Sequence, residues 1–152
     1  MNLSTKAAAV ALAIGAACTA AWAATPAQTI TARQANFKAI GKAFKALRDE
    51  VAKDSPSQAV FSANAAVLAN SAARIPGLFP VGTGQASGIK TAALPTIWTR
   101  NGDFRASANQ LLTSARAVQG AAAANNLGAV KAGIGRLGGS CKSCHDIFKA
   151  KD

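Results

Sequence analysis

The segment before the C-terminus carries the most constraining pattern in this chain, because its apolar residues alternate three and four positions apart. This spacing places them on one face of an α-helix, so 127–148 is predicted to be a helix that packs through a single seam. A helix of this kind must bury its apolar face against other helices. The seam residues are Leu127, Val130, Ile134, Leu137, Cys141, Cys144 and Phe148.

Three earlier segments show the same helical period, and together with the last they predict an all-α chain. They span about 27–53, 55–74 and 101–124. Alanine is abundant and runs of β-branched residues are absent, which favours helices over strands. Most connections between the segments are short, so neighbours along the chain are expected to pack antiparallel. The predicted fold is an antiparallel four-helix bundle.

Local signals indicate where these helices begin and end. Ser55 is the expected N-cap of the second helix, with Pro56 at its first position, and Asn126 is the expected cap of the last. Pro76 should end the second helix, and an irregular segment follows as far as Pro95. A loop of this length in a compact domain is usually functional or covers something.

The first 23 residues have the features of a secretory signal peptide. Lys6 supplies a positive charge, an alanine-rich apolar stretch follows, and Ala21-Trp22-Ala23 resembles a cleavage site. The stretch is too short and too rich in alanine to span a bilayer stably. Cys18 permits a lipoprotein alternative, although no leucine lies three positions before it. We expect cleavage after Ala23, leaving 24–152 as a single domain.

The chain is strongly basic, with a formal net charge of +11 that becomes +10 once Lys6 is removed. A charge of this sign favours attraction to acidic partners or anionic surfaces. Nucleic-acid binding is not expected, because no basic run is interleaved with aromatic residues and tyrosine is absent. No further apolar stretch is long enough to cross a membrane.

The seam of the last segment contains Cys141-Lys142-Ser143-Cys144-His145, with the spacing C-x-x-C-H. This spacing is the attachment motif of c-type haem. Residues three apart share a helix face, so both thiols can form thioethers with the vinyl groups of one haem. The adjacent imidazole then reaches the iron from the same side. The motif predicts one covalent haem c, held by Cys141 and Cys144, with His145 as the iron ligand.

Three other uses of the cysteine pair fit the sequence less well. A thioredoxin-like redox pair needs cysteines at the start of a helix that follows a strand. A zinc site needs a fourth ligand, and His145 is the only histidine in the chain. A structural disulfide between Cys141 and Cys144 leaves the adjacent histidine unexplained.

The residue types also limit what can bind the other side of the iron. The only methionine is Met1, which leaves with the signal peptide, and no second histidine exists. Lysine or the amino terminus could ligate only after losing a proton. We therefore expect five-coordinate, high-spin iron with an open position among apolar side chains, suited to a neutral diatomic gas.

With this motif, the chain resembles the class II cytochromes c, and specifically the cytochrome c-prime family, over essentially all of 24–152. Residues 138–146 hold the most specific match, close to the C-terminus. The run from Arg33 to Phe37 is similar to the family's first-helix pattern, and 75–80 and 94–98 are similar to its loop landmarks. The resemblance implies a left-handed, antiparallel four-helix bundle in the periplasm, often a homodimer packed through its first two helices.

The resemblance also implies roles for several residues at the haem. Arg33 and Gln34 would approach the propionates, although by position alone Arg33 is an ordinary solvated charge. Phe37 would cover the iron face where six-coordinate relatives have a ligating methionine. Thr91 is the expected contact from the long loop. Lys149 takes the place of a basic residue, commonly arginine, near the histidine side.

Gly135, Gly138 and Gly139 are among the glycines inside the last predicted helix. Each costs roughly 1 kcal/mol relative to alanine in a helix interior. A helix or a haem pressed against the backbone would explain them.

Two functions follow from these expectations. The first is the binding of NO or CO at the open iron position, which the resemblance associates with protection against nitrosative stress. The alternative is electron transfer, with the basic surface steering the protein to an acidic redox partner. An enzyme such as a peroxidase is not expected, because the first helix offers no acid or base near Phe37.

Overall fold

The computed structural model describes residues 24–151, and four long helices make up most of it. The four predicted segments are confirmed, with boundaries that differ by a few residues. The predicted signal peptide, 1–23, lies outside the described residues. The elements are α1 (Pro26–Val51), α2 (Gln58–Arg74), the 3-10 turns η1 (Ile75–Leu78) and η2 (Gln85–Ser87), α3 (Thr96–Thr99), α4 (Asn101–Ala123) and α5 (Leu127–Phe148).

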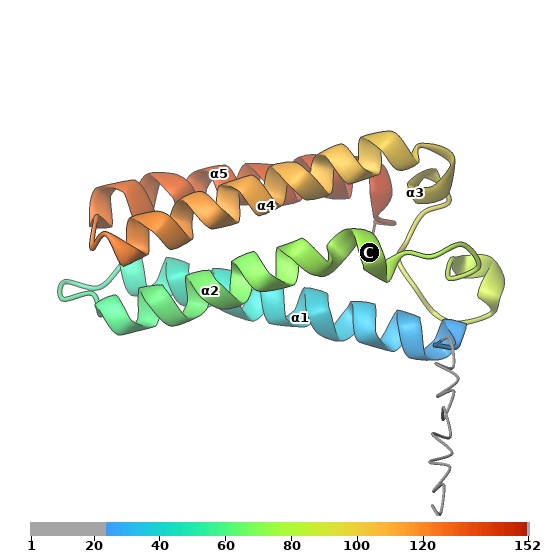
Figure 1. The fold of residues 1–152 in the computed structure, drawn as a ribbon, viewed down its shortest axis with the longest axis horizontal. Coiled ribbons are helices and arrows are strands. Elements are labelled where there is room, and N and C mark those ends of the chain that lie inside the picture. The colour runs from blue at the N-terminus through green and yellow to red at the C-terminus, as the bar shows by residue number, and fades with distance from the viewer. Residues whose placement is uncertain (1–23, 152) are drawn as a thin grey trace, which may run out of the picture.

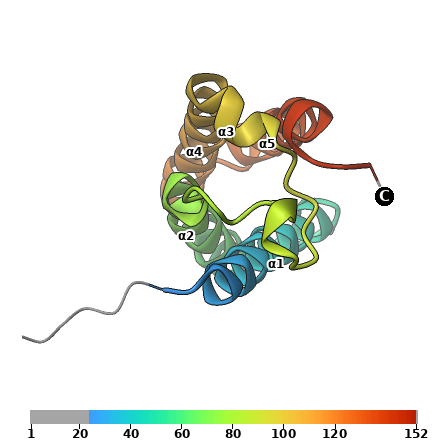
Figure 2. The same ribbon diagram turned by 90° about the vertical axis from the view of Figure 1, so that its right-hand side faces the viewer.

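The long helices pack side by side in the order α1, α2, α4, α5 (Figure 1). Contacts between α1 and α2, α2 and α4, and α4 and α5 are extensive, whereas α1 and α5 touch at few positions. Figure 2, which looks along the bundle, shows the chain between η2 and α3 crossing from α1 towards α5. The predicted antiparallel four-helix bundle is therefore confirmed, and the side between α1 and α5 is its most open side.

The predicted seam of α5 faces the bundle interior for most of its length. Val130, Ile134, Leu137 and Phe148 are buried, and both cysteines are half-buried. Leu127 differs from the prediction because it is exposed. It is the first residue of α5, at the end of the bundle, where few neighbours can cover it.

One glycine of α5 lets that helix approach α4 closely. A Cβ placed on Gly133 would lie 2.5 Å from Cγ2 of Val118, a separation that atoms cannot tolerate. A Cβ on Gly135 or Gly139 would meet no atom within 4 Å. Close helix packing therefore explains Gly133, which the sequence pattern did not single out, and does not explain Gly135 or Gly139.

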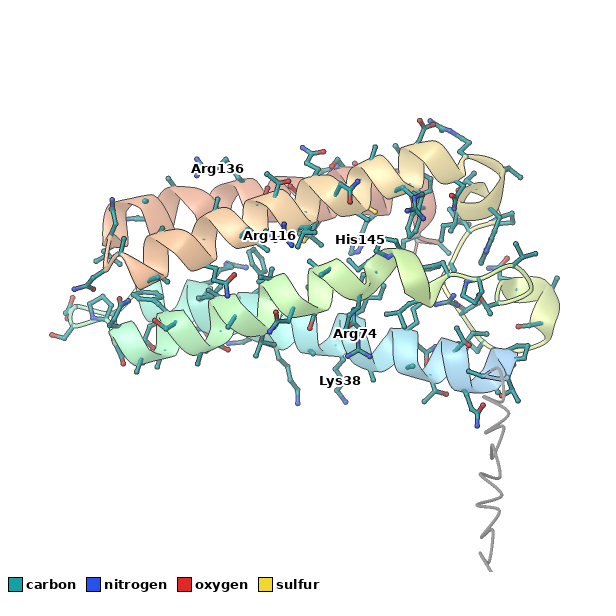
Figure 3. The ribbon with its side chains drawn as sticks, viewed as in Figure 1. Lys38, Arg74, Arg116, Arg136 and His145 are labelled. Atoms are coloured by element: carbon teal, nitrogen blue, oxygen red, sulfur yellow. The ribbon has the colours of Figure 1, made fainter. Side chains whose placement is uncertain are left out.

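The exterior of the bundle is basic. Figure 3 shows Lys38 projecting away from α1 and Arg136 on the opposite outer side, and both residues are exposed. Among the described residues, no helix combines the length and apolar character needed to cross a membrane.

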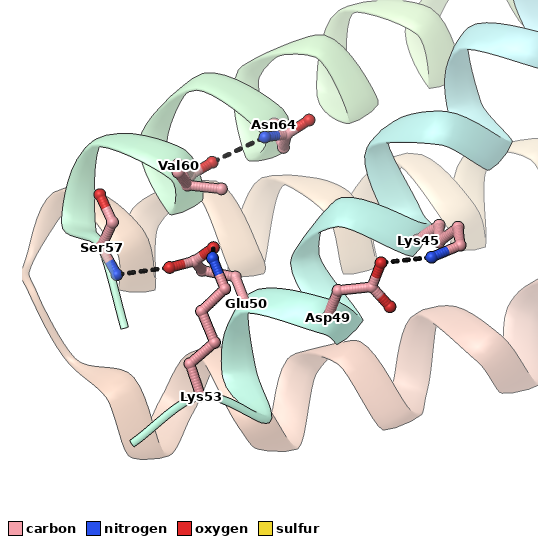
Figure 4. Close-up of polar contacts among 7 residues, drawn as sticks. All are labelled: Lys45, Asp49, Glu50, Lys53, Ser57, Val60 and Asn64. Carbon is pink, nitrogen blue, oxygen red and sulfur yellow. Dashed lines mark hydrogen bonds and ion pairs between the residues drawn. The ribbon is translucent and has the colours of Figure 1, made fainter. Parts of the chain in front are cut away.

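The connection from α1 to α2 differs from the predicted cap. Ser57, rather than Ser55, is the N-cap residue of α2, and its hydroxyl makes no capping hydrogen bond. The buried carboxylate of Glu50 accepts the Ser57 N–H instead, at 2.6 Å, and also pairs with Lys53 at 2.7 Å (Figure 4). A side chain from the end of α1 therefore accepts a backbone hydrogen bond at the start of α2. A serine at the expected cap position could not indicate this contact, because the acceptor lies in the preceding helix.

The long loop after α2 is tied to the end of α5. Leu94 N–H donates to the Phe148 carbonyl at 3.1 Å, and Ala150 N–H donates to the Ala92 carbonyl at 2.8 Å. The Thr96 hydroxyl donates to the Ile147 carbonyl at 2.9 Å. Thr96 belongs to α3, and these bonds hold the loop against the helix that carries the cysteine motif.

Candidate cofactor site

A cavity of about 530 Å³ is lined by residues of both α1 and α5, the two neighbouring long helices with the fewest contacts to each other. Its walls come from α1, α4, α5 and the loop, and most of the lining side chains are apolar. The structure brings all of the residues singled out from the sequence to this one cavity. They are Arg33, Gln34, Phe37, Thr91, Cys141, Cys144, His145 and Lys149.

The α5 side of the cavity presents the two thiols and the imidazole. Cys141 and Cys144 are free, and burial raises the pKa of both thiols, with a further contribution from Cys141 to Cys144. Thiols with raised pKa values stay protonated at neutral pH, unlike the activated thiolate of a redox pair. His145, labelled in Figure 3, lines the same cavity. Within residues 24–151, no three Cys, His, Asp or Glu side chains are grouped so that they could hold a metal ion.

Six residues of α1 line the cavity, with Arg33 and Gln34 at the end nearer the loop. The four that follow them, Phe37, Ile40, Gly41 and Phe44, are apolar and are here called the α1 wall. The Phe37 ring makes an edge contact with Phe79, with centroids 6.1 Å apart. Phe79 continues into an aromatic cluster with Phe104 at 4.7 Å. The position of Phe37 is therefore supported by rings behind it.

Arg33 is buried at the end of this wall, with 3% of its surface exposed. Its guanidinium donates to the Thr83 hydroxyl at 3.2 Å, the Thr83 carbonyl at 2.9 Å and the Thr91 hydroxyl at 2.9 Å. It also donates to the Leu78 carbonyl at 3.4 Å and lies 4.5 Å from the centroid of the Phe79 ring. Burial lowers the pKa of this guanidinium. The interpretation of Arg33 as a solvated charge is therefore wrong.

Gln34 and Lys149 stand at the loop side of the cavity. The Gln34 amide donates to the Lys90 carbonyl at 3.1 Å, so neighbouring residues of α1 both hold the loop. Lys149 follows the end of α5 and forms an isolated antiparallel bridge with Ala93. The loop, α1 and the end of α5 thus meet around one rim.

Sequence reasoning missed several residues of the site. Thr83 binds Arg33 through both its hydroxyl and its carbonyl, but nothing in the loop sequence marks it. Ala108 and Leu111 of α4 line the cavity. Helical spacing can place such residues on an inward face, but it cannot distinguish a cavity from the core.

The chemistry of this cavity suits a haem. Apolar walls can enclose a flat macrocycle, and α5 offers two thiols and an imidazole on one side. Within the described part of the chain, the hydrogen-bond partners of the buried Arg33 cation are neutral oxygens, so haem carboxylates would supply the missing negative charge. Fold and site together define a helical-bundle c-type cytochrome.

Comparison with known proteins identifies the family. A family model described as Cytochrome C' matches residues 28–149. The chain belongs to the cytochrome c' family, whose members bind c-type haem with its iron. The resemblance seen in the sequence and the predicted cofactor are both confirmed.

Individual relatives cover most of the chain. It is similar to a cytochrome c' of Rhodopseudomonas palustris, with 36% identity over 80% of this chain and 82% of the relative. Its fold is similar to a nitric oxide complex of a mutant of cytochrome c prime from Alcaligenes xylosoxidans, with a TM-score of 0.75, 27% identity, and 84% and 98% of the two chains covered. It is also similar to a cytochrome c' with an unusual ligand-controlled dimer dissociation, with a TM-score of 0.78 and 27% identity. That match covers 86% of this chain and 100% of the other.

Proposed function

We propose that this chain is a periplasmic, mono-haem cytochrome c' that binds small diatomic gases, NO and CO. In this proposal Cys141 and Cys144 hold the haem through thioethers, and His145 ligates the iron. Five-coordinate, high-spin haem iron supplies reversible binding of a neutral diatomic molecule at its open position. Binding of NO would serve to sequester it and to protect the cell against nitrosative stress.

The composition of the α1 wall carries this proposal. Because the thiols and the imidazole belong to α5, the α1 wall would face the other side of a haem held by them. Two phenylalanines, an isoleucine and a glycine form it, and none of these residues can ligate iron. From residue 24 onward the sequence has no methionine and no histidine besides His145. An open coordination position follows if no amine reaches the iron.

The surrounding residues suit a neutral ligand. The α1 wall offers no hydrogen-bond donor from its side chains, so anions that must shed water are disfavoured there. Phe37 would limit the space available, so sterics rather than hydrogen bonds would decide which gases bind. The nitric oxide complex of the Alcaligenes xylosoxidans relative supports this ligand class.

The absorption spectrum of the purified ferrous protein, before and after addition of NO, tests the proposal. We expect a broad high-spin spectrum that changes when NO is added. A sharp low-spin spectrum that is indifferent to NO would show that a sixth ligand is bound and would overturn the proposal.

Electron transfer is the second candidate function, and the charge of the chain favours it. The formal net charge of +10 from residue 24 onward would attract an acidic redox partner. High-spin, five-coordinate iron is expected to reorganise more on electron transfer than six-coordinate iron, which favours gas binding as the main role. The proposal includes no enzymatic reaction.

Assembly and location belong to the same proposal. We expect a homodimer packed through α1 and α2, and the relative with ligand-controlled dimer dissociation supports testing it with and without CO. The signal peptide expected at 1–23 would direct the protein to the periplasm. Sedimentation of the haem-loaded protein tests whether it is a homodimer. Fractionation of the host cell tests whether the protein is periplasmic.

A further inference from the structure

Gly41 is a position within the apolar α1 wall where the cavity lining is exposed to solvent, as Gln34 is nearer the loop. It lines the cavity and is itself exposed. Phe37 precedes it by four residues and Phe44 follows it by three, so all three share one helix face. A Cβ placed on Gly41 would meet no neighbouring atom within 4 Å, so neither phenylalanine ring closes over it. The glycine leaves a notch between two aromatic side chains.

The two sides of this notch are well defined. A Cβ placed on Gly138 of α5 would lie 3.6 Å from Cζ of Phe44, so α1 and α5 approach each other at Phe44. On the other side, the Phe37 ring is supported by its edge contact with Phe79. The notch therefore lies between the rings of Phe37 and Phe44, and each ring packs against a residue of another segment.

Packing within the protein does not account for Gly41. A glycine inside a helix is less favourable than alanine, and a Cβ placed on Gly41 would meet no other protein atom within 4 Å. Gly135 of α5 has equally open surroundings but does not line the cavity. What distinguishes Gly41 is its place in the cavity wall.

The opposite end of the cavity is lined by polar contacts. Gln34 donates to the Lys90 carbonyl there, and Arg33 binds the loop through Thr83 and Thr91. A small neutral molecule crosses an apolar opening more readily than an end occupied by hydrogen-bonded polar groups. The notch at Gly41 is thus the better route to the α1 side of the cavity.

We infer that the notch at Gly41 is the passage through which diatomic gases reach the α1 side of the cavity, and that the missing side chain at Gly41 sets how fast they pass. This inference rests on the proposed gas binding. A passage differs from a binding contact in one measurable way. Narrowing it slows association and dissociation by the same factor and leaves the affinity unchanged.

The test compares Gly41→Ala and Gly41→Leu with Gly135→Ala and Gly135→Leu in the haem-loaded protein. CO association is measured by flash photolysis, and CO dissociation by displacement with NO. We expect Gly41→Leu to slow both rates about tenfold and Gly41→Ala about twofold, because a close-packed wall responds to each added carbon. Both Gly135 variants should keep the wild-type rates.

A second measurement does not depend on gas binding. The midpoint of thermal unfolding, followed by far-UV circular dichroism, should rise in both Gly41→Ala and Gly135→Ala, because alanine favours the helix. A lower midpoint or a lower yield of covalent haem in Gly41→Ala would mean that the glycine is needed for packing, and would overturn the inference.

Two kinetic outcomes would also overturn it. One is an unchanged CO association rate in Gly41→Leu. The other is a slower association accompanied by an equal loss of affinity, which would mean that the new side chain crowds the bound gas. If the wild-type protein itself forms no CO or NO adduct, the proposed function fails and the inference fails with it.

Discussion

At the scale of single residues, Arg33 organises the polar end of an otherwise apolar cavity. Its guanidinium binds the loop at Leu78, Thr83 and Thr91 while it lies over the Phe79 ring. All of its hydrogen-bond acceptors are neutral, so a buried positive charge is left for an anion to balance. The Arg33 side chain thus holds the loop in place and also offers a positive charge that can pair with a carboxylate bound in the cavity.

Replacing Arg33 with methionine should destabilise the haem-loaded protein by about 3 kcal/mol, because buried loop oxygens lose their donors. Urea unfolding followed by circular dichroism measures the change. The neighbouring variant Gln34→Ala removes one exposed hydrogen bond and should cost less than about 1 kcal/mol. Equal effects of the two variants would contradict the central role given to Arg33.

Phe37→Ala should increase both the CO association rate and the CO affinity, each by about tenfold, because the removed ring limits the space for a bound gas. Flash photolysis and equilibrium titration measure the two quantities. This pattern differs from that expected at Gly41, where the rates change and the affinity does not. Unchanged CO binding in Phe37→Ala would show that Phe37 does not restrict the ligand.

At the scale of the helices, the junction between α1 and α2 depends on a charged side chain. Glu50 accepts hydrogen bonds from Lys53 and from the Ser57 N–H, and these contacts lower the pKa of its carboxyl below the ordinary 4.5. A carboxyl with a lowered pKa stabilises the fold above its ordinary pKa. That stabilisation is lost as the pH falls through the lowered value.

Glu50→Gln should therefore destabilise the protein at pH 7, and the difference from wild type should shrink as the pH falls below about 4.5. Urea unfolding at a series of pH values between roughly 3 and 7 measures it. Asp54→Asn, which removes an exposed carboxylate of the same connection, is the matched control and should have little effect at any pH. A Glu50→Gln difference that stays constant with pH would refute the role given to the carboxylate.

At the scale of the whole molecule, positive charge is the dominant electrostatic feature. Exposed basic residues lie on opposite outer sides of the bundle, with Lys38 on α1 and Arg136 on α5 as examples (Figure 3). Attraction between such a surface and an anion extends over about 10 Å at an ionic strength near 0.1 M and weakens as salt is added. The rates at which the protein encounters charged reactants should therefore depend on the salt concentration.

Oxidation of the ferrous protein by ferricyanide should slow by about tenfold as ionic strength rises from roughly 0.01 to 0.5 M. Oxidation by the cationic complex tris(phenanthroline)cobalt(III) should become faster over the same range. Stopped-flow absorbance measures both rates. The same salt dependence for both oxidants would mean that the net charge does not steer encounters at the haem.

The sequence predicted the helices and the cofactor because both are encoded by local spacing. The three-and-four alternation in α5 holds within one helix, and the cysteines and His145 are nearly adjacent. The capping of α5 by Asn126 was also predicted and is observed, since the side chain accepts the Ala129 N–H three residues away. Interactions within one or two turns leave a pattern that can be recognised without knowing where the rest of the chain lies.

Only the tertiary structure decided the contacts that join distant segments. Arg33 and Thr91 are 58 residues apart, and Arg33 is buried because the loop returns across the end of α1. Glu50 reaches Ser57, seven residues on, because the chain reverses between two packed helices. The sequence by itself thus determined the bundle and its haem. The burial of Arg33, the helix junction at Glu50 and the notch at Gly41 arise only when the helices pack, because the residues that form each of them come from separate segments of the chain.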